Sequence, residues 1–245
     1  MSCALMYHDV VPHGSSDLSG FPGADAARYK VTPARFAAHL DALLRIGHVA
    51  QDVATLVTFD DGGASALRAA DLLEERGLRG WFFVTTDYIG HRGFLDARDL
   101  RELHARGHVV GSHSCSHPLR MAHCSDRQLN DEWVRSRSAL TVILGHDVAT
   151  ASVPGGDYSA RVALAAGAAG FTSLFTSEPT RTIEQVGPVT VRGRFVVRHA
   201  TTPRTVSALA SGARWPAAVQ LAGWNVRKGM KRVAGTTYLR LRRRL

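Results

Sequence analysis

The feature that most constrains the fold of this 245-residue chain is the alternation of short β-like runs with helix-length amphipathic stretches. Repeated strand–helix–strand segments joined by short loops predict βαβ units in a mainly parallel sheet. We expect strands at 4–8, 56–59, 80–84, 108–112, 149–153 and 171–175, and helices at 33–47, 66–77, 97–106, 126–144 and 160–167. Residues 9–31 predict a long loop, because they are rich in Gly, Pro, Ser and Asp. An open doubly wound sheet and a barrel both fit this α/β pattern.

The net charge of +9 is concentrated near the C-terminus. Residues 185–245 contain 13 of the 30 basic residues and no acidic residue, because the last one is Glu184. The first 184 residues therefore carry 17 basic and 21 acidic side chains, a net charge of −4. This distribution argues against a nucleic-acid-binding protein, in which the basic surface belongs to the folded body.

Composition and the N-terminal residues set the expected compartment. The hydrophobic fraction of 45% is enough for a sizeable core, and the three cysteines form no CxxC pair. The first residues lack a basic region followed by an apolar stretch, so we expect no signal peptide. We accordingly expect a reduced, cytoplasmic protein.

Two adjacent carboxylates, Asp60 and Asp61, follow the predicted strand 56–59. Functional groups in both candidate folds gather where strands end, and paired carboxylates repel each other unless a cation or a proton intervenes. The alternative is a structural turn that caps the helix beginning at Ala66.

A second strand-end loop contains His113 and His117, which are separated by small residues. Pro118 disfavours helix at His117, so we expect the loop to turn and both imidazoles to converge. Together with Asp61 they form a predicted site for a divalent metal. Zinc is expected, because two imidazoles and a carboxylate leave an open position for water. Cobalt, nickel and manganese fit the same ligands. We interpret the intervening Cys115 as a packing residue.

A third loop supplies candidate substrate and oxyanion contacts: Pro154, Gly155, Gly156 and Tyr158. Paired glycines after a strand let the backbone approach a ligand and offer N–H donors. The alternative is a plain turn into the helix that begins near Ser159. With the metal polarising a carbonyl and activating water, Asp60 is placed as general base. This set of residues predicts hydrolysis of an amide or an ester.

These motifs resemble the polysaccharide deacetylases of the NodB-homology type, carbohydrate esterase family 4. TFDDG at 58–62 and HSCSH at 113–117 are similar to that family's first two motifs, VPGGDYS at 153–159 resembles its third, and Tyr7-His8 is similar to a segment of bacterial members. The resemblance covers roughly residues 3–200. It implies a distorted (β/α)7 barrel, Asp60 as base, and Asp61, His113 and His117 as metal ligands.

Two parts of the family pattern are absent from their usual places. The arginine that orients the base is replaced by Ser152 and Val153 before Pro154, and Arg161, Arg194 and Arg198 are candidates to substitute for it. The general acid is assigned to His199, with His8 as an alternative.

The C-terminal segment 223–245 carries eight basic residues interleaved with apolar ones. One interpretation is an outer helix with a solvated basic face. The other is a helix lying on the anionic inner face of a membrane. An anionic polysaccharide or a lipid-pyrophosphate-linked glycan is a further candidate partner, and nucleic acid ranks last. We assign residues 1–204 to a catalytic domain and 205–245 to a basic helical extension.

The resemblance implies a metal-dependent hydrolase that removes N-acetyl groups from amino sugars of a polysaccharide or glycan precursor. Because no export signal is expected, a lipid-linked or nucleotide-linked sugar is the expected substrate. Alternatives are another amide or an O-acetyl ester as substrate, or a non-catalytic glycan-binding protein. The sequence does not indicate an oligomeric state.

Overall fold

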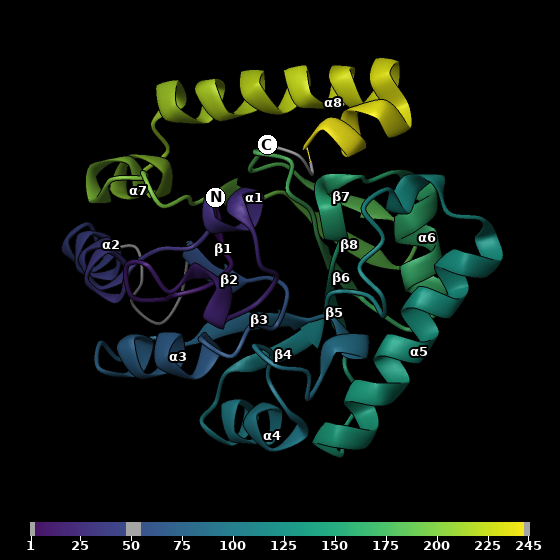
Figure 1. Cartoon of the computed structure of the whole chain (residues 1–245), viewed down its shortest axis with the longest axis horizontal. Coiled ribbons are helices and arrows are strands. Elements are labelled where there is room, and N and C mark those ends of the chain that lie inside the picture. Colours follow the sequence, from purple (N-terminus) through teal and green to yellow (C-terminus); the bar gives the residue numbers. More distant parts are fainter. Residues whose placement is uncertain (1–2, 48–54, 243–245) are drawn as a thin grey trace.

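The computed structural model describes residues 3–47 and 55–242 and contains one curled, mainly parallel sheet (Figure 1). Its strand order is β7-β8-β6-β5-β4-β3-β2-β1-β9, and only the β7–β8 pair is antiparallel. The strands are β1 (Cys3–Tyr7), β2 (Thr55–Phe59), β3 (Gly80–Val84), β4 (Val109–Ser112), β5 (Thr150–Ser152), β6 (Ser173–Phe175), β7 (Ile183–Val186), β8 (Val189–Arg192) and β9 (Phe195–Val196).

Helices cover the outer side of the curled sheet (Figure 1). They are α2 (Pro33–Arg45), α3 (Ala66–Glu74), α4 (Ala97–Ala105), α5 (Asp126–Leu144), α6 (Ala160–Ala168) and α7 (Pro203–Ala210). The other helices are the short α1 (Ala24–Ala27) and the long α8 (Arg214–Arg242). The side chains of Thr32, Asp96 and Ser125 cap α2, α4 and α5. The barrel-like α/β fold is confirmed in a distorted form, because the sheet has free edges at β7 and β9.

The predicted loop 9–31 contains more structure than expected. It holds a 3-10 turn at Ser16–Leu18 and the short helix α1. Its folding centres on buried Lys30, whose Nζ donates to the carbonyls of Ser16, Ser19 and Phe21 and lies 3.5 Å from an Asp9 carboxylate oxygen. A buried ammonium must satisfy its donors, so the loop wraps around it.

The sheet beyond β6 was not predicted. β7 is mostly exposed and β9 has only two residues, so neither has the apolar pattern of a buried strand. β9 nevertheless helps to position functional groups, because Arg194 directly precedes it and Arg198 follows it.

Aromatic packing holds the N-terminal strands together. Tyr7 packs edge-on against Phe36 at 5.1 Å between ring centroids, and Phe59 stacks on Phe82 at 4.7 Å. The register pairs Tyr7 with Phe59 at the carboxyl ends of β1 and β2. His8 and Asp60, the next residue of each strand, therefore emerge side by side at the same end of the sheet.

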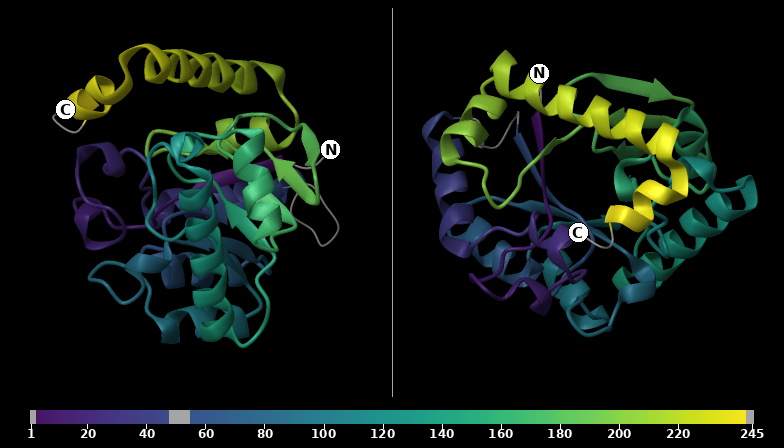
Figure 2. Two further views of the ribbon diagram at one scale, coloured as in Figure 1. Left: turned by 90° about the vertical axis from the view of Figure 1, so that its right-hand side faces the viewer. Right: turned by 45° about the horizontal axis from the view of Figure 1, so that its top comes forward.

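The C-terminal helices complete the fold. Val206 and Leu209 of α7 belong to the main core, so this core extends beyond residue 204, where we predicted a domain boundary. The two-domain division stays a prediction. α8 lies across the molecule (Figure 2), and Gln220 accepts from the Val196 N–H and donates to its carbonyl, both at 3.0 Å. Among the residues with described structure, none forms a helix long and apolar enough to cross a membrane.

Candidate active site

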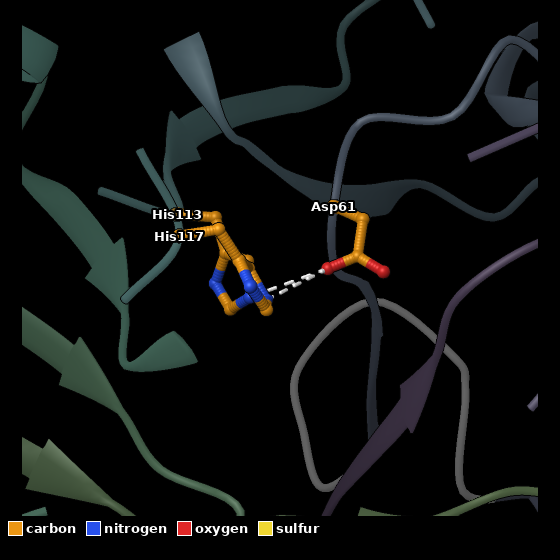
Figure 3. Close-up of side chains that lie close together, drawn as sticks. All are labelled: Asp61, His113 and His117. Carbon is orange, nitrogen blue, oxygen red and sulfur yellow. Dashed lines mark ion pairs between the residues drawn. The ribbon is translucent and has the colours of Figure 1, made fainter. Parts of the chain in front are cut away.

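Asp61, His113 and His117 converge at the carboxyl ends of β2 and β4 (Figure 3). Asp61 Oδ1 lies 3.5 Å from His113 Nε2 and 3.4 Å from His117 Nε2, and the three ligand atoms lie within 4.8 Å of one another. Asp61 Oδ1 is buried and accepts no hydrogen bond. A buried carboxylate oxygen that faces two imidazole nitrogens fits a divalent cation, because the cation would satisfy it.

The backbone around these ligands adopts conformations that L residues rarely take. Asp61, Ser114 and His117 have φ values of 77°, 63° and 61°, and they are the only non-glycine residues with positive φ in the described part of the chain. Such conformations cost roughly 1–3 kcal/mol each and concentrate at functional sites. All three lie in the two loops of the candidate metal site.

Glu132 of α5 fixes the loop that contains both histidines. Its Oε2 accepts from the N–H groups of Cys115 and Ser116 at 2.9 and 2.8 Å. Its Oε1 accepts from the Ser116 hydroxyl at 2.5 Å. These charge-assisted bonds hold the strained turn between the imidazoles.

Gly63, which directly follows the first motif, allows a close contact. A Cβ on Gly63 would lie 2.1 Å from Asp9 Oδ1 and 2.7 Å from Ser19 Oγ. No side chain fits there, so the turn after Asp61 packs directly onto the Asp9 segment, which follows His8.

Ser152 links a candidate metal ligand to the candidate base. His113 Nδ1 lies 2.5 Å from Ser152 Oγ, and this hydroxyl donates to Asp60 Oδ1 at 3.0 Å. Since the serine proton goes to Asp60, His113 Nδ1–H donates to Ser152. We assign this tautomer from the hydrogen bonds. It leaves the Nε2 lone pair facing Asp61 and free for a metal.

Arg194 orients Asp60. The guanidinium NH1 donates to Asp60 Oδ1 and NH2 to Oδ2, both at 2.7 Å, and both side chains are buried. Of the three arginines considered from sequence, Arg161 instead pairs with Asp126, and Arg198 lies over the Tyr29 ring. Arg194 therefore occupies the place of the base-orienting arginine that is missing before Pro154.

Burial and charge set the protonation states in the site. Burial raises the pKa of Asp60, but Arg194 and then His113 more than offset this, so the net pKa lies below its ordinary value. Burial also raises the pKa of Asp61, but the nearby imidazoles of His117, His8 and His113 more than offset this, so its net pKa is lowered. Burial lowers the pKa of His113 to about 4. Both carboxylates are thus charged and His113 neutral near neutral pH, as metal binding requires.

The site opens into a cavity of about 730 Å³. Gly155, Gly156 and Tyr158 line it, whereas buried Pro154 does not. The prediction that Pro154 offers an oxyanion contact is wrong for its backbone, because proline has no N–H. Tyr158 has a buried hydroxyl without a hydrogen-bond partner.

The two candidate general acids lie in different places. His199 is exposed, is not among the residues that line the cavity, and its Nδ1 lies 3.4 Å from the Arg28 carbonyl. His8 lines the cavity, and its Nδ1 is buried without a partner. His8 also lowers the pKa of Asp60 and Asp61 by its charge. Geometry therefore favours His8, the alternative, over His199.

Cys115 lies between the histidines but does not join them. Its buried thiol donates to Asp87 Oδ1 at 2.9 Å, and burial raises its pKa to about 11. A protonated thiol is neither a metal ligand nor a nucleophile, which agrees with its interpretation as a packing residue.

Residues far from the motifs also line the cavity. Trp224, Arg227 and Lys228 of α8 and Arg198 after β9 contribute to it. Sequence reasoning placed α8 outside the catalytic unit, because its basic pattern is equally typical of a solvated helix.

An open α/β barrel with a candidate Asp-His-His metal site at its strand ends is the scaffold of a hydrolase. The chain belongs to the polysaccharide deacetylase family, whose model matches residues 49–174. The family expected from the motifs at 58–62 and 113–117 is thereby confirmed. The matched range contains Asp60, Asp61 and both histidines, but neither His8 nor Arg194.

One relative of known sequence and two solved structures are similar to this chain. The chain is 26% identical over 125 residues to YxkH of Bacillus subtilis (strain 168), a match that covers 51% of this chain and 44% of YxkH. The fold is similar to that of BC0361, a polysaccharide deacetylase from Bacillus cereus (TM-score 0.73, 20% identity, 85% of this chain and 68% of that one). It is also similar to IcaB from Ammonifex degensii (TM-score 0.64, 24% identity, 88% and 96%).

Proposed function

We propose that this protein hydrolyses the N-acetyl group of an amino sugar in a glycan or glycan precursor. The observation that carries the proposal is the unpartnered Asp61 Oδ1, which faces His113 and His117 beside a carboxylate that Arg194 keeps charged. A divalent ion, expected to be zinc, fits these ligands. When bound, it supplies a Lewis acid that polarises the substrate carbonyl and lowers the pKa of water.

Asp60 is the proposed general base. Its lowered pKa keeps it ionised, and Arg194 fixes both of its oxygens relative to the metal ligands. Asp60 accepts a proton from the attacking water as the new C–O bond forms. Because Arg194 holds the carboxylate in place, little reorganisation accompanies this step.

Tyr158 and the 155–156 turn are proposed to bind the carbonyl oxygen as it gains negative charge. The unpartnered Tyr158 hydroxyl and the backbone of Gly155 and Gly156 border the cavity. Hydrogen-bond donors aimed at a developing oxyanion stabilise the transition state.

His8 is the proposed general acid. When the C–N bond breaks, the leaving nitrogen takes a proton from His8, and the products are acetate and a free amino sugar. The cavity position of His8 supports this role.

Acetate release tests the proposed function. Purified holoprotein is incubated with N-acetylated chitooligosaccharides and, in parallel, with O-acetylated sugars. Faster acetate release from the N-acetylated set supports the proposal, whereas turnover of the O-acetylated set alone means that the site is an esterase. If the protein binds metal and sugar but turns over neither set, it is a glycan-binding protein. The hydrogen bonds from Arg194 to Asp60 argue against this outcome, because a protein that only binds glycans needs no oriented base.

We further propose that α8 rests on an anionic membrane. The protein would then be cytoplasmic and bound to the inner face of the cell membrane. Trp215, Val219 and Val226 are 77%, 53% and 62% exposed and recur at helical spacing along one side of α8. Residues 185–245 supply the basic charge that anionic headgroups attract. Liposome flotation of the native chain and of Trp215→Ser tests this. Weaker flotation of the variant with anionic vesicles is expected, and equal flotation would contradict it.

A further inference from the structure

α8 forms one wall of the catalytic cavity. Trp224, Arg227 and Lys228 line the same cavity as Asp60 and the metal ligands. The two hydrogen bonds between Gln220 and Val196 fix this part of α8 to β9, and Val196 itself lines the cavity. Figure 2 shows the helix passing over the curled sheet. The helix is therefore placed to touch a substrate.

The cavity side of α8 is opposite to its exposed apolar side. At about 100° per residue, Trp224 and Lys228 lie about 140° to 180° around the helix from Val219 and Val226. Among the side chains of α8 that the structure describes, Trp224 is the only large apolar one that lines the cavity. The two sides of α8 therefore meet different surroundings.

Two cations at this wall, Lys228 of α8 and Arg198 after β9, have no acidic partner among the described residues. Lys228 Nζ lies 4.4 Å above the Trp224 ring, and the Arg198 guanidinium lies 5.7 Å from the Tyr29 ring. Within the described residues, neither forms a salt bridge. Of the acids near this rim, Asp157 pairs with His123 at 3.1 Å, and Asp25 lies 3.9 Å from Arg28. The wall is therefore electropositive, and the aromatic rings hold its cations in place.

We propose that this wall binds a phosphate ester on the amino sugar, with Lys228 and Arg198 contacting phosphate oxygens and Trp224 lying against the sugar ring. This inference rests on the proposed function and narrows its substrate to sugars linked through phosphate or diphosphate. The cations stand on two different elements, so two donors approach one anion from separate directions. A nucleotide diphosphate and a lipid diphosphate supply the same group.

Substrate comparison tests the inference on full-length holoprotein. Acetate release is measured with N-acetylglucosamine 1-phosphate, a nucleotide diphosphate N-acetylglucosamine, a short-chain prenyl diphosphate N-acetylglucosamine and neutral chitooligosaccharides. We expect kcat/KM to be at least about 10-fold higher for phosphorylated sugars, as one hydrogen bond to a charged group implies. Preference for the prenyl over the nucleotide compound identifies a lipid-linked source, and the reverse a nucleotide-linked one.

Variants show whether the wall causes the preference. Lys228→Gln and Arg198→Gln should each reduce about 10-fold the ratio of kcat/KM for phosphorylated sugars to kcat/KM for neutral sugars. Arg214→Gln removes the same charge from α8 at an exposed position outside the cavity, and its ratio should not change. Equal turnover of phosphorylated and neutral sugars, or a preference that survives both variants, would overturn the inference.

A binding measurement separates this inference from the proposed function. If no compound releases acetate, the proposed function fails. Calorimetric titration of the full-length Asp60→Asn protein with N-acetylglucosamine 1-phosphate and with N-acetylglucosamine still tests the wall. The inference is supported if the phosphorylated sugar binds more tightly than the neutral one and if Lys228→Gln weakens this tighter binding. Equal affinities for the two sugars would overturn it.

Discussion

Arg194 and Asp60 are joined by two parallel hydrogen bonds of 2.7 Å, although 134 residues separate them in sequence. Both side chains are buried, so the pair holds a carboxylate in a fixed orientation next to the candidate metal ligands. A bidentate arginine restricts both oxygens of a carboxylate, which a lysine does not do.

Replacing Arg194 tests this orientation. We expect Arg194→Lys to keep the charge but lower kcat on the order of 100-fold, because a misplaced base reacts slowly. Arg194→Met leaves a buried carboxylate without its partner and should also lower the free energy of unfolding by about 3–5 kcal/mol. Steady-state kinetics and denaturant melts measure both effects. Arg161→Gln is the control, because this exposed arginine pairs with Asp126, and wild-type kcat in Arg194→Lys would contradict the assigned role.

Ser152 is expected to control metal affinity through His113. Ser152→Ala removes the closer of the two acceptors for His113 Nδ1–H and leaves only the residue-152 carbonyl, 3.2 Å away, so it should weaken zinc binding roughly 10-fold. Competition with a chromophoric chelator measures the dissociation constant. Ser177→Ala changes another cavity-lining serine, one that makes no contact with the histidines among the described interactions. Unchanged affinity in Ser152→Ala would show that His113 does not depend on this hydroxyl.

The general acid is tested by two histidine variants. His8→Asn should lower kcat about 100- to 10,000-fold while metal content stays at the wild-type level. His199→Asn should change kcat little, because His199 is exposed outside the cavity. The opposite result, with activity lost only in His199→Asn, would restore the assignment made from sequence.

His108, remote from the metal ligands, makes stability depend on pH. Its buried ring accepts from the Gly80 N–H through Nδ1 and contacts Glu74 through Nε2. Burial lowers its pKa below 6.5, so the unfolded chain binds the proton more readily. The contribution of neutral His108 to the free energy of unfolding is complete above pH 6.5. It is lost as the pH falls towards the pKa of His108 in the folded protein, at up to about 1.4 kcal/mol per pH unit.

Urea unfolding between pH 7.5 and 5 measures this dependence. His108→Gln should flatten it, whereas His104→Gln, an exposed neighbour on α4, should not. Equal slopes in all three proteins would contradict the role of His108.

The sequence predicts the central strands, the long helices and the Asp61, His113 and His117 cluster, because each depends on a local pattern. Strand runs alternate with capped amphipathic helices, and parallel strand ends meet at one edge of the sheet. It names Arg194 only as one of three candidates to orient Asp60, and it does not predict the role of Ser152 or the place of α8, since these contacts depend on how distant segments pack. Arg194 follows a short, partly exposed hairpin with no strong strand pattern, and Ser152 resembles any small strand residue.

Two signals in the sequence could have narrowed the remaining choices. His8 directly follows a buried strand and shares its register with Asp60, which favours it over His199. Proline at 154 excludes a backbone donor at that position. The contact between Arg198 and Tyr29, by contrast, is visible only in three dimensions, because these residues lie in two loops far apart in sequence.

Metal content and acetate release, measured on the same preparations of native protein, Asp60→Asn and Asp61→Asn, test the account most directly. We predict one divalent ion per chain in the native protein and in Asp60→Asn, with turnover nearly abolished in the latter. Asp61→Asn should lose both the ion and turnover. Undiminished turnover in Asp60→Asn, or native metal affinity in Asp61→Asn, would contradict the account.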